Sequence, residues 1–306
     1  MKPRIVFLVG PTAAGKTDVA VALAKKIKAE IISCDSMQVY RGMDILTSRP
    51  PLTFSKSIPH YLLNIISPEK EYNVSRYRKD ATLKIKEIIK RRKVPLIVGG
   101  SGLYMSILID GIFKGNPVAK AMRNRLYQEA KVKGSKYLYE RLKDFDPDAA
   151  IKIHPHDTKR IIRALEVFEA TGKPISYLQR QRRGLADEYK IKIFCLNMQR
   201  DKLYRRIEER VERMFARGAV PEVKKLLKLK LSKTARYALG IREIKGYLEG
   251  VYDLKEAKCL MKRNTRLYAK RQLTWFRKDK RIQWVEVKGG EKTASIANRI
   301  IKNLAT

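Results

Sequence analysis

The residues whose types and spacing most directly predict chemistry form an N-terminal loop that matches the phosphate-binding pattern G-x-x-x-x-G-K-[ST]. Glycines at positions 10 and 15 let backbone N–H groups close around phosphate oxygens at a helix N-terminus, where the helix dipole favours an anion. Lys16 would add a positive charge for the terminal phosphates, and Thr17 would offer its hydroxyl to Mg²⁺, the expected cofactor. We therefore expect a diphosphate or triphosphate to bind Gly10, Pro11, Thr12, Ala13, Ala14, Gly15, Lys16 and Thr17.

Two further candidates follow later predicted strands. Asp35 comes directly after the run 29–34, and ligands of open α/β sheets bind beyond the carboxyl ends of the strands. Asp35 is therefore expected to face the ligand of the loop, although an aspartate here could instead cap the next turn. Ser101 follows the apolar run 94–98, at a point where most phosphate-loop hydrolases carry a magnesium-binding carboxylate. That difference argues against an ATP-driven motor.

The elements that must position these residues indicate an α/β fold. The apolar run 5–9 precedes the loop as a buried strand would, and 18–28 follows it with helical periodicity. Further strands are expected at 189–196 and 282–287. A helix is predicted over 74–92, with a core-facing side made of Tyr77, Ala81, Leu83, Ile85, Ile88 and Ile89.

The domain organisation follows from the stretch 116–185, which is helical and charged and lacks any strand-like apolar run. We interpret it as an all-helical insertion domain of about 70 residues, near the low end of domain sizes. It would divide a phosphate-loop-NTPase-like parallel sheet flanked by helices into a first part, 1–115, and a second part, 186–306. The second part would carry basic C-terminal helices.

Charge is the most unusual bulk property of this chain. It has 68 Lys and Arg residues against 31 Asp and Glu residues, a formal net charge of +37 over 306 residues. Such an excess favours a polyanionic partner, and nucleic acid more than membrane, although a merely solvated surface is the alternative. No apolar run approaches the length of a membrane span, and the three cysteines show no disulfide or zinc spacing. We therefore expect a cytoplasmic protein without a membrane partner.

Two helical stretches concentrate this charge. In the first, which Asp157 could start, Ile161, Leu165 and Phe168 recur at core spacing, whereas Lys159, Arg160 and Arg163 project away from them. In the second, 253–278, a basic stripe lies beside aromatic residues, a pattern that suits phosphate backbones and unstacked bases. That stripe comprises Arg263, Arg266, Lys270 and Arg277, and its aromatic neighbours are Tyr268, Trp275 and Phe276. A solvated cationic face is again the alternative.

Five motifs, taken together, resemble the tRNA dimethylallyltransferase family over nearly the whole chain. They are the loop 10–17, Asp35-Ser36-Met37-Gln38-Val39-Tyr40, Gly99-Gly100-Ser101-Gly102-Leu103-Tyr104, the helix 160–167 and Tyr268–Arg277. The resemblance implies transfer of a dimethylallyl group from dimethylallyl diphosphate to N6 of the adenine just 3′ of the anticodon, position 37. The products would be N6-isopentenyladenosine and diphosphate. The zinc-finger tail of eukaryotic relatives is absent before Thr306, which suggests the bacterial type.

The resemblance also implies roles for individual residues. Asp35 would act as general base on the adenine amine, and Ser101, where relatives often have threonine, would donate to the bridging oxygen of the donor. The other partner would be the anticodon stem-loop of tRNA, and we expect a monomer. The expected RNA contacts are Asp35, Ser36, Met37, Gln38, Ser101, Arg123, Lys159, Arg160, Ile161, Ile162, Arg163, Arg236, Arg242, Lys270 and Arg271.

Two other classes of protein share parts of this pattern. A small-molecule or nucleoside kinase would have the same loop, with Asp35 activating an acceptor hydroxyl, but it leaves the charge of +37 unexplained. A nucleic-acid-binding ATPase or structural RNA binder would use the loop for regulation. Label transfer from dimethylallyl diphosphate or from ATP would distinguish these classes.

Overall fold

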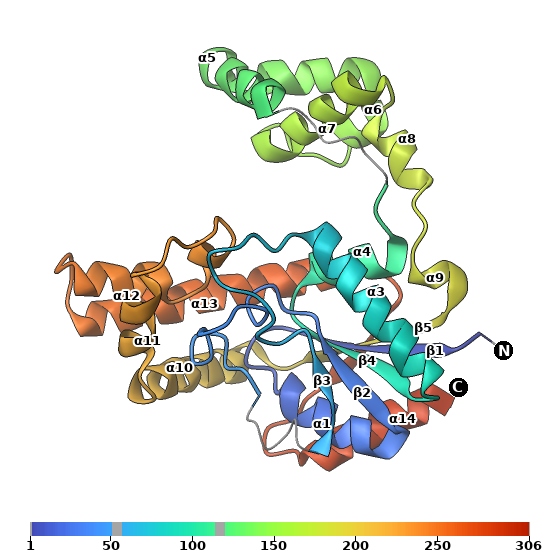
Figure 1. The fold of residues 1–306 in the computed structure, drawn as a ribbon, viewed down its shortest axis with the longest axis vertical. Coiled ribbons are helices and arrows are strands. Elements are labelled where there is room, and N and C mark those ends of the chain that lie inside the picture. The colour runs from blue at the N-terminus through green and yellow to red at the C-terminus, as the bar shows by residue number, and fades with distance from the viewer. Residues whose placement is uncertain (1, 51–56, 114–119, 306) are drawn as a thin grey trace. The chain divides into compact units, whose positions relative to one another are not determined.

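A parallel β-sheet forms the centre of the computed structural model, which describes residues 2–50, 57–113 and 120–305. Within these residues the sheet has six strands in the order β3-β2-β4-β1-β5-β6 (Figure 1). The strands are β1 (Arg4–Val9), β2 (Ala29–Ser33), β3 (His60–Tyr61), β4 (Val94–Gly99), β5 (Lys190–Asn197) and β6 (Ile282–Glu286). Residues 5–9 of β1 are at most 1% exposed, as expected of a parallel strand that is covered on both faces.

The register of the central strands brings three loops to one edge of the sheet. Val9, the last residue of β1, pairs with Gly99 of β4, and Ser33, the last residue of β2, pairs with Val98. The segments that follow β1, β2 and β4 therefore begin at the same level. This is the edge at which α/β sheets bind ligands.

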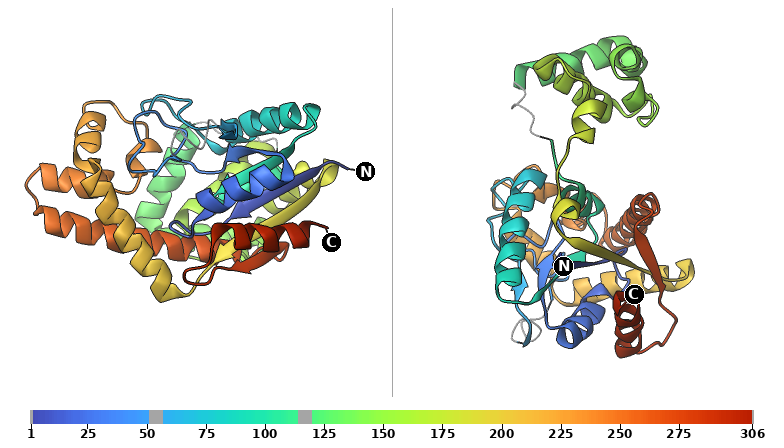
Figure 2. Two further views of the ribbon diagram at one scale, coloured as in Figure 1. Left: turned by 90° about the horizontal axis from the view of Figure 1, so that it is seen from below. Right: turned by 90° about the vertical axis from the view of Figure 1, so that its right-hand side faces the viewer.

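Helices cover both faces of the sheet (Figures 1 and 2). On one face, α1 (Lys16–Ile27) packs with α14 (Thr293–Ala305) over a core of aliphatic side chains. On the other face lie α3 (Val74–Lys90) and α4 (Gly102–Asp110), joined by stacked Tyr77 and Tyr104 rings with centroids 3.9 Å apart.

One residue that was predicted on the core face of α3, Leu83, is exposed instead. Tyr77, Ala81, Ile85 and Ile88 are fully buried, but Leu83 is 51% exposed. Leu83 lies two residues from both Ala81 and Ile85, and at 3.6 residues per turn that offset points to the opposite side of the helix. The expectation that Leu83 faces the core was therefore wrong.

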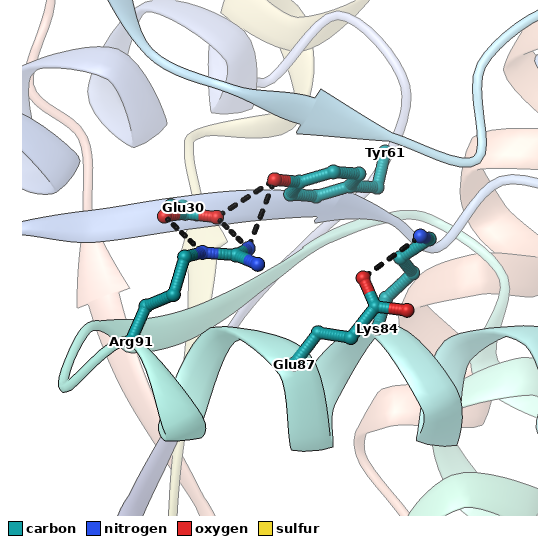
Figure 3. Close-up of polar contacts among 5 residues, drawn as sticks. All are labelled: Glu30, Tyr61, Lys84, Glu87 and Arg91. Carbon is teal, nitrogen blue, oxygen red and sulfur yellow. Dashed lines mark hydrogen bonds and ion pairs between the residues drawn. The ribbon is translucent and has the colours of Figure 1, made fainter.

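A buried carboxylate, paired with a half-exposed arginine, connects the two strands at one edge of the sheet, as Figure 3 shows. Glu30 of β2 accepts hydrogen bonds from Arg91 Nη2 at 2.6 Å and from the Tyr61 hydroxyl of β3 at 2.8 Å. Burial alone would raise the pKa of Glu30, but the hydrogen bonds from Arg91 and Tyr61 lower it below its usual value. The short strand β3, which the sequence did not predict, is thus held to β2 through side chains as well as its ladder.

Basic helices extend the unit beyond the carboxyl edge of the sheet (Figures 1 and 2). They are α10 (Arg200–Ala216), α11 (Ala219–Leu226), a 3₁₀ turn (Ala235–Tyr237), α12 (Ile241–Leu248) and the long α13 (Leu254–Phe276). Ion pairs join α10 to α13, from Glu208 to Arg266 and from Glu212 to Lys258. These helices place charged side chains next to the strand ends.

The chain divides into two compact units, Met1–Ile109 with Glu188–Thr306, and Asp110–Asp187. The expected boundary between residues 115 and 116 lies outside the described residues. The second unit is helical: α5 (Lys120–Phe145), α6 (Pro147–Ala150), α7 (Thr158–Thr171), α8 (Ile175–Arg180) and the start of α9 (Leu185–Glu188). Its own core contains Leu126, Leu142, Ile161 and Leu165. No helix in the described ranges of the chain is long and apolar enough to cross a membrane.

Candidate active site

A cavity of about 480 Å³ opens where β1, β2 and β4 end, and all of its lining belongs to the first unit. The phosphate loop forms one side, and the segment after β2 and residues 47–50 form others. Helices α10 and α13 close it. The polar lining side chains include Thr12, Lys16, Thr17, Asp18, Ser33, Asp35, Gln38, Thr47, Ser48, Arg49, His60, Arg206, Arg210, Arg213, Arg217, Tyr268 and Gln272.

The phosphate loop has the backbone shape that its glycines allow. Gly10 has a φ of 146°, and a Cβ there would lie 2.8 Å from the backbone oxygen of Leu196 in β5, so no larger residue fits. Gly15 has a φ of 86° and directly precedes α1, which begins at Lys16. The Lys16 Nζ donates to the Gly10 oxygen at 2.9 Å and to the Pro11 oxygen at 2.8 Å. These two bonds hold the Lys16 ammonium group against the first residues of the phosphate loop.

Three arginines of α10 and Arg217, the residue that follows its last turn, form the positively charged wall of the cavity, and the sequence did not connect them to the site. Arg206, Arg210, Arg213 and Arg217 all line it, at spacings of four, three and four that place them on one helix face. Burial and the nearby Arg210 lower the pKa of Lys16 to about 8, and burial lowers the pKa of Arg210 as well. Because these cations lie close together with few acids, the cavity is suited to a polyanion.

Asp35 caps a turn, which was the alternative considered from the sequence, and it also lines the cavity. Its Oδ1 accepts a hydrogen bond from the Met37 N–H at 2.9 Å, as a turn-capping aspartate does, and its side chain also lines the cavity. Its negative charge acts against the lowering of the Lys16 pKa, so the two groups are electrostatic neighbours. Tyr268 of α13 is another neighbour, since burial and the Asp35 charge raise the pKa of its phenol.

Ser101 lies beside Asp35 but does not line the cavity. Its Oγ accepts a hydrogen bond from the Ser36 N–H at 3.2 Å, and its own N–H donates to the Cys34 oxygen at 3.1 Å. The hydroxyl proton of Ser101 is not used by the bond from Ser36, because the oxygen is the acceptor there. The segments after β2 and β4 are therefore joined at this residue.

Gln38 and Glu222 hold the loop 43–50 against the cavity. The Gln38 side chain donates to the Thr47 oxygen at 3.3 Å and accepts from Ser33 Oγ at 3.0 Å. Glu222 of α11 accepts from the backbone N–H groups of residues 45 and 46, at 2.8 and 2.9 Å. Sequence reasoning had no signal for Glu222, which lies 177 residues away from the first of these amides.

The expected RNA contacts of the second unit differ in how far their side chains reach solvent. Ile161 and Ile162 are 0% and 2% exposed, so their side chains belong to the core of this unit and cannot contact RNA. The expectation for these two side chains has to be corrected accordingly. Lys159 and Arg160 are exposed, with Asp157 capping α7 in front of them as predicted.

Arg123 and Arg163 share one buried carboxylate. Both guanidinium groups bind Glu166, whose side chain is 1% exposed. Burial would raise the pKa of Glu166, but hydrogen bonds from Arg123 and the charge of that residue lower it. Each arginine is thus oriented by Glu166 while much of its own side chain remains in solvent.

The predicted basic stripe on α13 is only partly a surface feature. Lys270 and Arg271 are exposed, as are Arg236 and Arg242 on neighbouring segments. Arg266, however, pairs with Glu208 of α10 at 2.7 Å, and Phe276 is 0% exposed. Phe276 therefore cannot act as a stacking platform for a base, whereas Trp275 is 37% exposed. The correction arises because α13 packs on α10 and the sheet, which periodicity alone does not reveal.

The donor set at the loop fits Mg²⁺ only when phosphates complete it. In the described part of the chain no three His, Cys, Asp or Glu side chains gather as a metal site. Thr17 and Asp35 do line the same cavity, and Mg²⁺ is commonly bound by one or two protein oxygens together with substrate phosphates and water. The residues present thus match a metal that is shared with a bound diphosphate.

Comparison with protein families and curated proteins gives concordant results. A family model described as IPP transferase matches residues 38–279, and one described as isopentenyl transferase matches residues 3–62. A tRNA dimethylallyltransferase of Carboxydothermus hydrogenoformans is 47% identical over 306 residues, with 98% of this chain and 97% of the relative covered. One from Thermoanaerobacter sp. strain X514 is 47% identical, with 100% and 98% covered.

Solved structures share the fold over almost the entire chain. A full-length tRNA isopentenylpyrophosphate transferase from Bacillus halodurans has a TM-score of 0.72 at 38% identity, covering 100% of this chain and 97% of that one. A eukaryotic dimethylallyltransferase, captured in crystallographic snapshots acting on tRNA, has a TM-score of 0.81 at 28% identity, covering 98% and 80%.

Proposed function

This chain belongs to the IPP transferase family of tRNA dimethylallyltransferases, and we propose that it transfers a dimethylallyl group to tRNA. The donor is dimethylallyl diphosphate, and the acceptor is N6 of adenine 37, directly 3′ of the anticodon. The products are N6-isopentenyladenosine and diphosphate. A small-molecule or nucleoside kinase is not favoured, because relatives matched over the whole chain are transferases that act on tRNA.

The observation that carries this proposal is the joint presence of Lys16, Arg210 and Asp35 in one cavity. The two cations suit a leaving diphosphate, on which negative charge develops as the donor C–O bond breaks. The carboxylate suits the other partner, because the adenine amine becomes acidic as its new C–N bond forms. One cavity therefore contains groups suited to the leaving diphosphate and a group suited to the attacking amine.

In the proposed reaction the carbon–oxygen bond of the donor breaks and a bond from that carbon to N6 forms. The N6 proton passes to the Asp35 carboxylate, whose turn-capping bond to the Met37 N–H fixes its orientation. Ser101 accepts from the Ser36 N–H, so its own hydroxyl proton can be donated to the bridging oxygen that leaves. Mg²⁺ held through Thr17 would supply further positive charge to the diphosphate.

The acceptor must be presented as an unstacked base, because N6 of a stacked adenine cannot enter a cavity at a strand edge. We propose that the anticodon stem-loop binds through exposed cations on both units, including Lys159, Arg160, Arg242 and Arg271. The net charge of +37 supports attraction to the RNA backbone.

The direct test incubates the purified protein with Mg²⁺, defined tRNAs and radiolabelled dimethylallyl diphosphate, in parallel with γ-labelled ATP. Label that enters tRNA from the first donor supports the proposed transfer. If label passes from ATP to a small acceptor and none enters RNA from dimethylallyl diphosphate, the result contradicts the proposed transfer. It would support a kinase instead.

A further inference from the structure

A glutamine outside all of the assigned roles connects two walls of the cavity. Gln272 of α13 is 6% exposed, and both atoms of its amide are used. Its Oε1 accepts from the Thr12 N–H of the phosphate loop at 2.9 Å, and its Nε2 donates to the Gly100 oxygen at 3.0 Å. Neither bond is made within its own helix.

The segment after β4 is shaped to admit this side chain. A Cβ at Gly100 would lie 2.1 Å from Gln272 Nε2, and one at Gly102 would lie 2.2 Å from Trp275 Cδ1. A Cβ at either position would force the Gln272 amide or the Trp275 ring to move, so the two glycines leave room for these side chains of α13. The run of glycines around Ser101 therefore accommodates α13 as well as any ligand.

Gln272 joins the loop proposed to bind the diphosphate to the segment that carries the proposed proton donor, Ser101. Thr12 is in the loop that would hold the diphosphate, and Gly100 directly precedes Ser101, which would donate to the bridging oxygen. Small displacements of reacting groups cost large factors in rate, because the bound geometry has to approach that of the transition state. A rigid link between the two segments would therefore affect turnover.

We propose that Gln272 is a positioning residue, which fixes the phosphate loop relative to the Ser101 segment through one buried amide. The proposal rests on the function proposed above. Losing the link leaves the Thr12 N–H and the Gly100 oxygen without this partner, and the loop becomes free to shift relative to Ser101. Diphosphate binding and turnover are then impaired together, while tRNA binding at exposed cations is not.

The same helix supplies a matched control. Thr265 is 5% exposed, and its hydroxyl donates to the Met261 oxygen one turn earlier, within α13 itself. It therefore resembles Gln272 in burial and in being a polar residue with a satisfied hydrogen bond, but it joins no second element through that bond. Thr265→Val therefore removes only a hydrogen bond that lies within α13.

The experiment compares Gln272→Met and Thr265→Val with the unmodified protein. It measures kcat and KM for the donor, the affinity for inorganic diphosphate with Mg²⁺ by calorimetry, the affinity for tRNA, and thermal unfolding. For Q272M we expect kcat to fall at least tenfold and diphosphate affinity to fall several-fold, with tRNA affinity within twofold. T265V should retain both kcat and diphosphate affinity.

A Q272M protein whose kcat and diphosphate affinity stay within twofold of the unmodified protein overturns the proposal, as does an equal loss in T265V. If Q272M does not fold, Gln272→Glu keeps the shape and the acceptor for Thr12 but loses the donor to Gly100. Unchanged kcat in a folded Q272E likewise overturns it. Failure of the unmodified protein to modify tRNA would instead reject the proposed function, and calorimetry with diphosphate would still report on Gln272.

Discussion

At the scale of single residues, the candidate site contains side chains that hydrogen-bond the backbone and also line the cavity. Asp35 caps the turn after β2 and lines the cavity, and Lys16 bridges two oxygens of its own loop. These internal bonds orient the charged groups before any substrate arrives, so less reorganisation is needed on binding. The same double use means that a mutation must be chosen to separate the two roles.

Asp35→Asn should separate chemistry from structure. The asparagine oxygen can still accept from the Met37 N–H, but an amide cannot take the proton from N6. We expect turnover to fall by about 10²–10⁴-fold, the usual contribution of a general base, while tRNA affinity stays within a few-fold. Single-turnover transfer and filter binding measure the two quantities. Asp35→Ala, which also loses the turn bond, serves as the comparison, and full activity of D35N would remove Asp35 as the base.

The lowered pKa of Lys16, about 8 in the free protein, predicts a pH dependence of diphosphate binding. A bound anion favours the charged lysine, so the pKa of the complex lies above that of the free protein. As pH rises above 8, binding must take up a proton, and affinity should decrease by up to tenfold per pH unit. Calorimetry between pH 7 and 9.5 measures this, with Lys16→Met correcting for titration of diphosphate itself. Parallel profiles for the two proteins would contradict it.

The lowered pKa of Lys16 also determines how this residue makes the free energy of unfolding depend on pH. The unfolded chain retains the proton on Lys16 up to about pH 10.5, the ordinary value, whereas the folded protein releases it near 8. Between these pH values the unfolded state binds more protons, so this lysine makes the free energy of unfolding increase as pH rises. Lys16→Met should weaken that increase in denaturant titrations.

At the scale of elements, α10 is the helix that most changes the interpretation of the site. Its three cavity-lining arginines, with Arg217 at its C-terminal cap, line the same cavity as the phosphate loop although they lie far from it in the sequence. Its acids Glu208 and Glu212 pair with α13. The helix thus divides its charge into a basic face that lines the cavity and a face that joins a neighbouring helix. Without α10 the loop would bind phosphate through one lysine and its amides.

Arg210→Met should weaken diphosphate binding at least tenfold, because it removes a cation that lines the cavity and whose pKa is already lowered by burial. Arg205→Met is the matched control, since Arg205 is an exposed neighbour on the same helix and does not line the cavity. Calorimetry with Mg²⁺ and diphosphate compares the two variants. Equal effects of both substitutions would show that only the overall charge of the helix matters.

At the scale of the whole molecule, the net charge of +37 is distributed over two units, and the expected RNA contacts lie on both. Binding to a polyanion should then depend on many weak phosphate contacts, each of which releases counterions. On the second unit, the buried Glu166 orients two of the expected contacts, Arg123 and Arg163.

The affinity for the anticodon stem-loop should therefore decrease linearly with the logarithm of salt concentration. Arg160→Ala should reduce the magnitude of that slope by about one, because one phosphate contact is lost. Lys25→Ala, in the last turn of α1, is the control for an exposed cation away from the expected RNA contacts. Filter binding between 50 and 300 mM salt measures the slopes. An unchanged slope for R160A would indicate that this face of α7 is merely solvated.

The sequence by itself determined the features that depend on neighbouring residues. The loop 10–17, the buried strand before it and the cap of α7 at Asp157 are local patterns, and helical and strand periods located most elements. The position of Asp35 at the end of β2 followed from the general location of sites in parallel sheets. The motifs also sufficed to indicate the family.

Only the tertiary structure decided which distant residues share the site. Gln272 meets Thr12 across 260 positions, and the arginines of α10 face a loop near the N-terminus. Periodicity distinguishes the faces of a helix but not what each face contacts, which is why Ile162 and Phe276 were expected at an RNA surface and lie in cores. Strand order and helix packing create these contacts, and they depend on long-range burial that no local pattern contains.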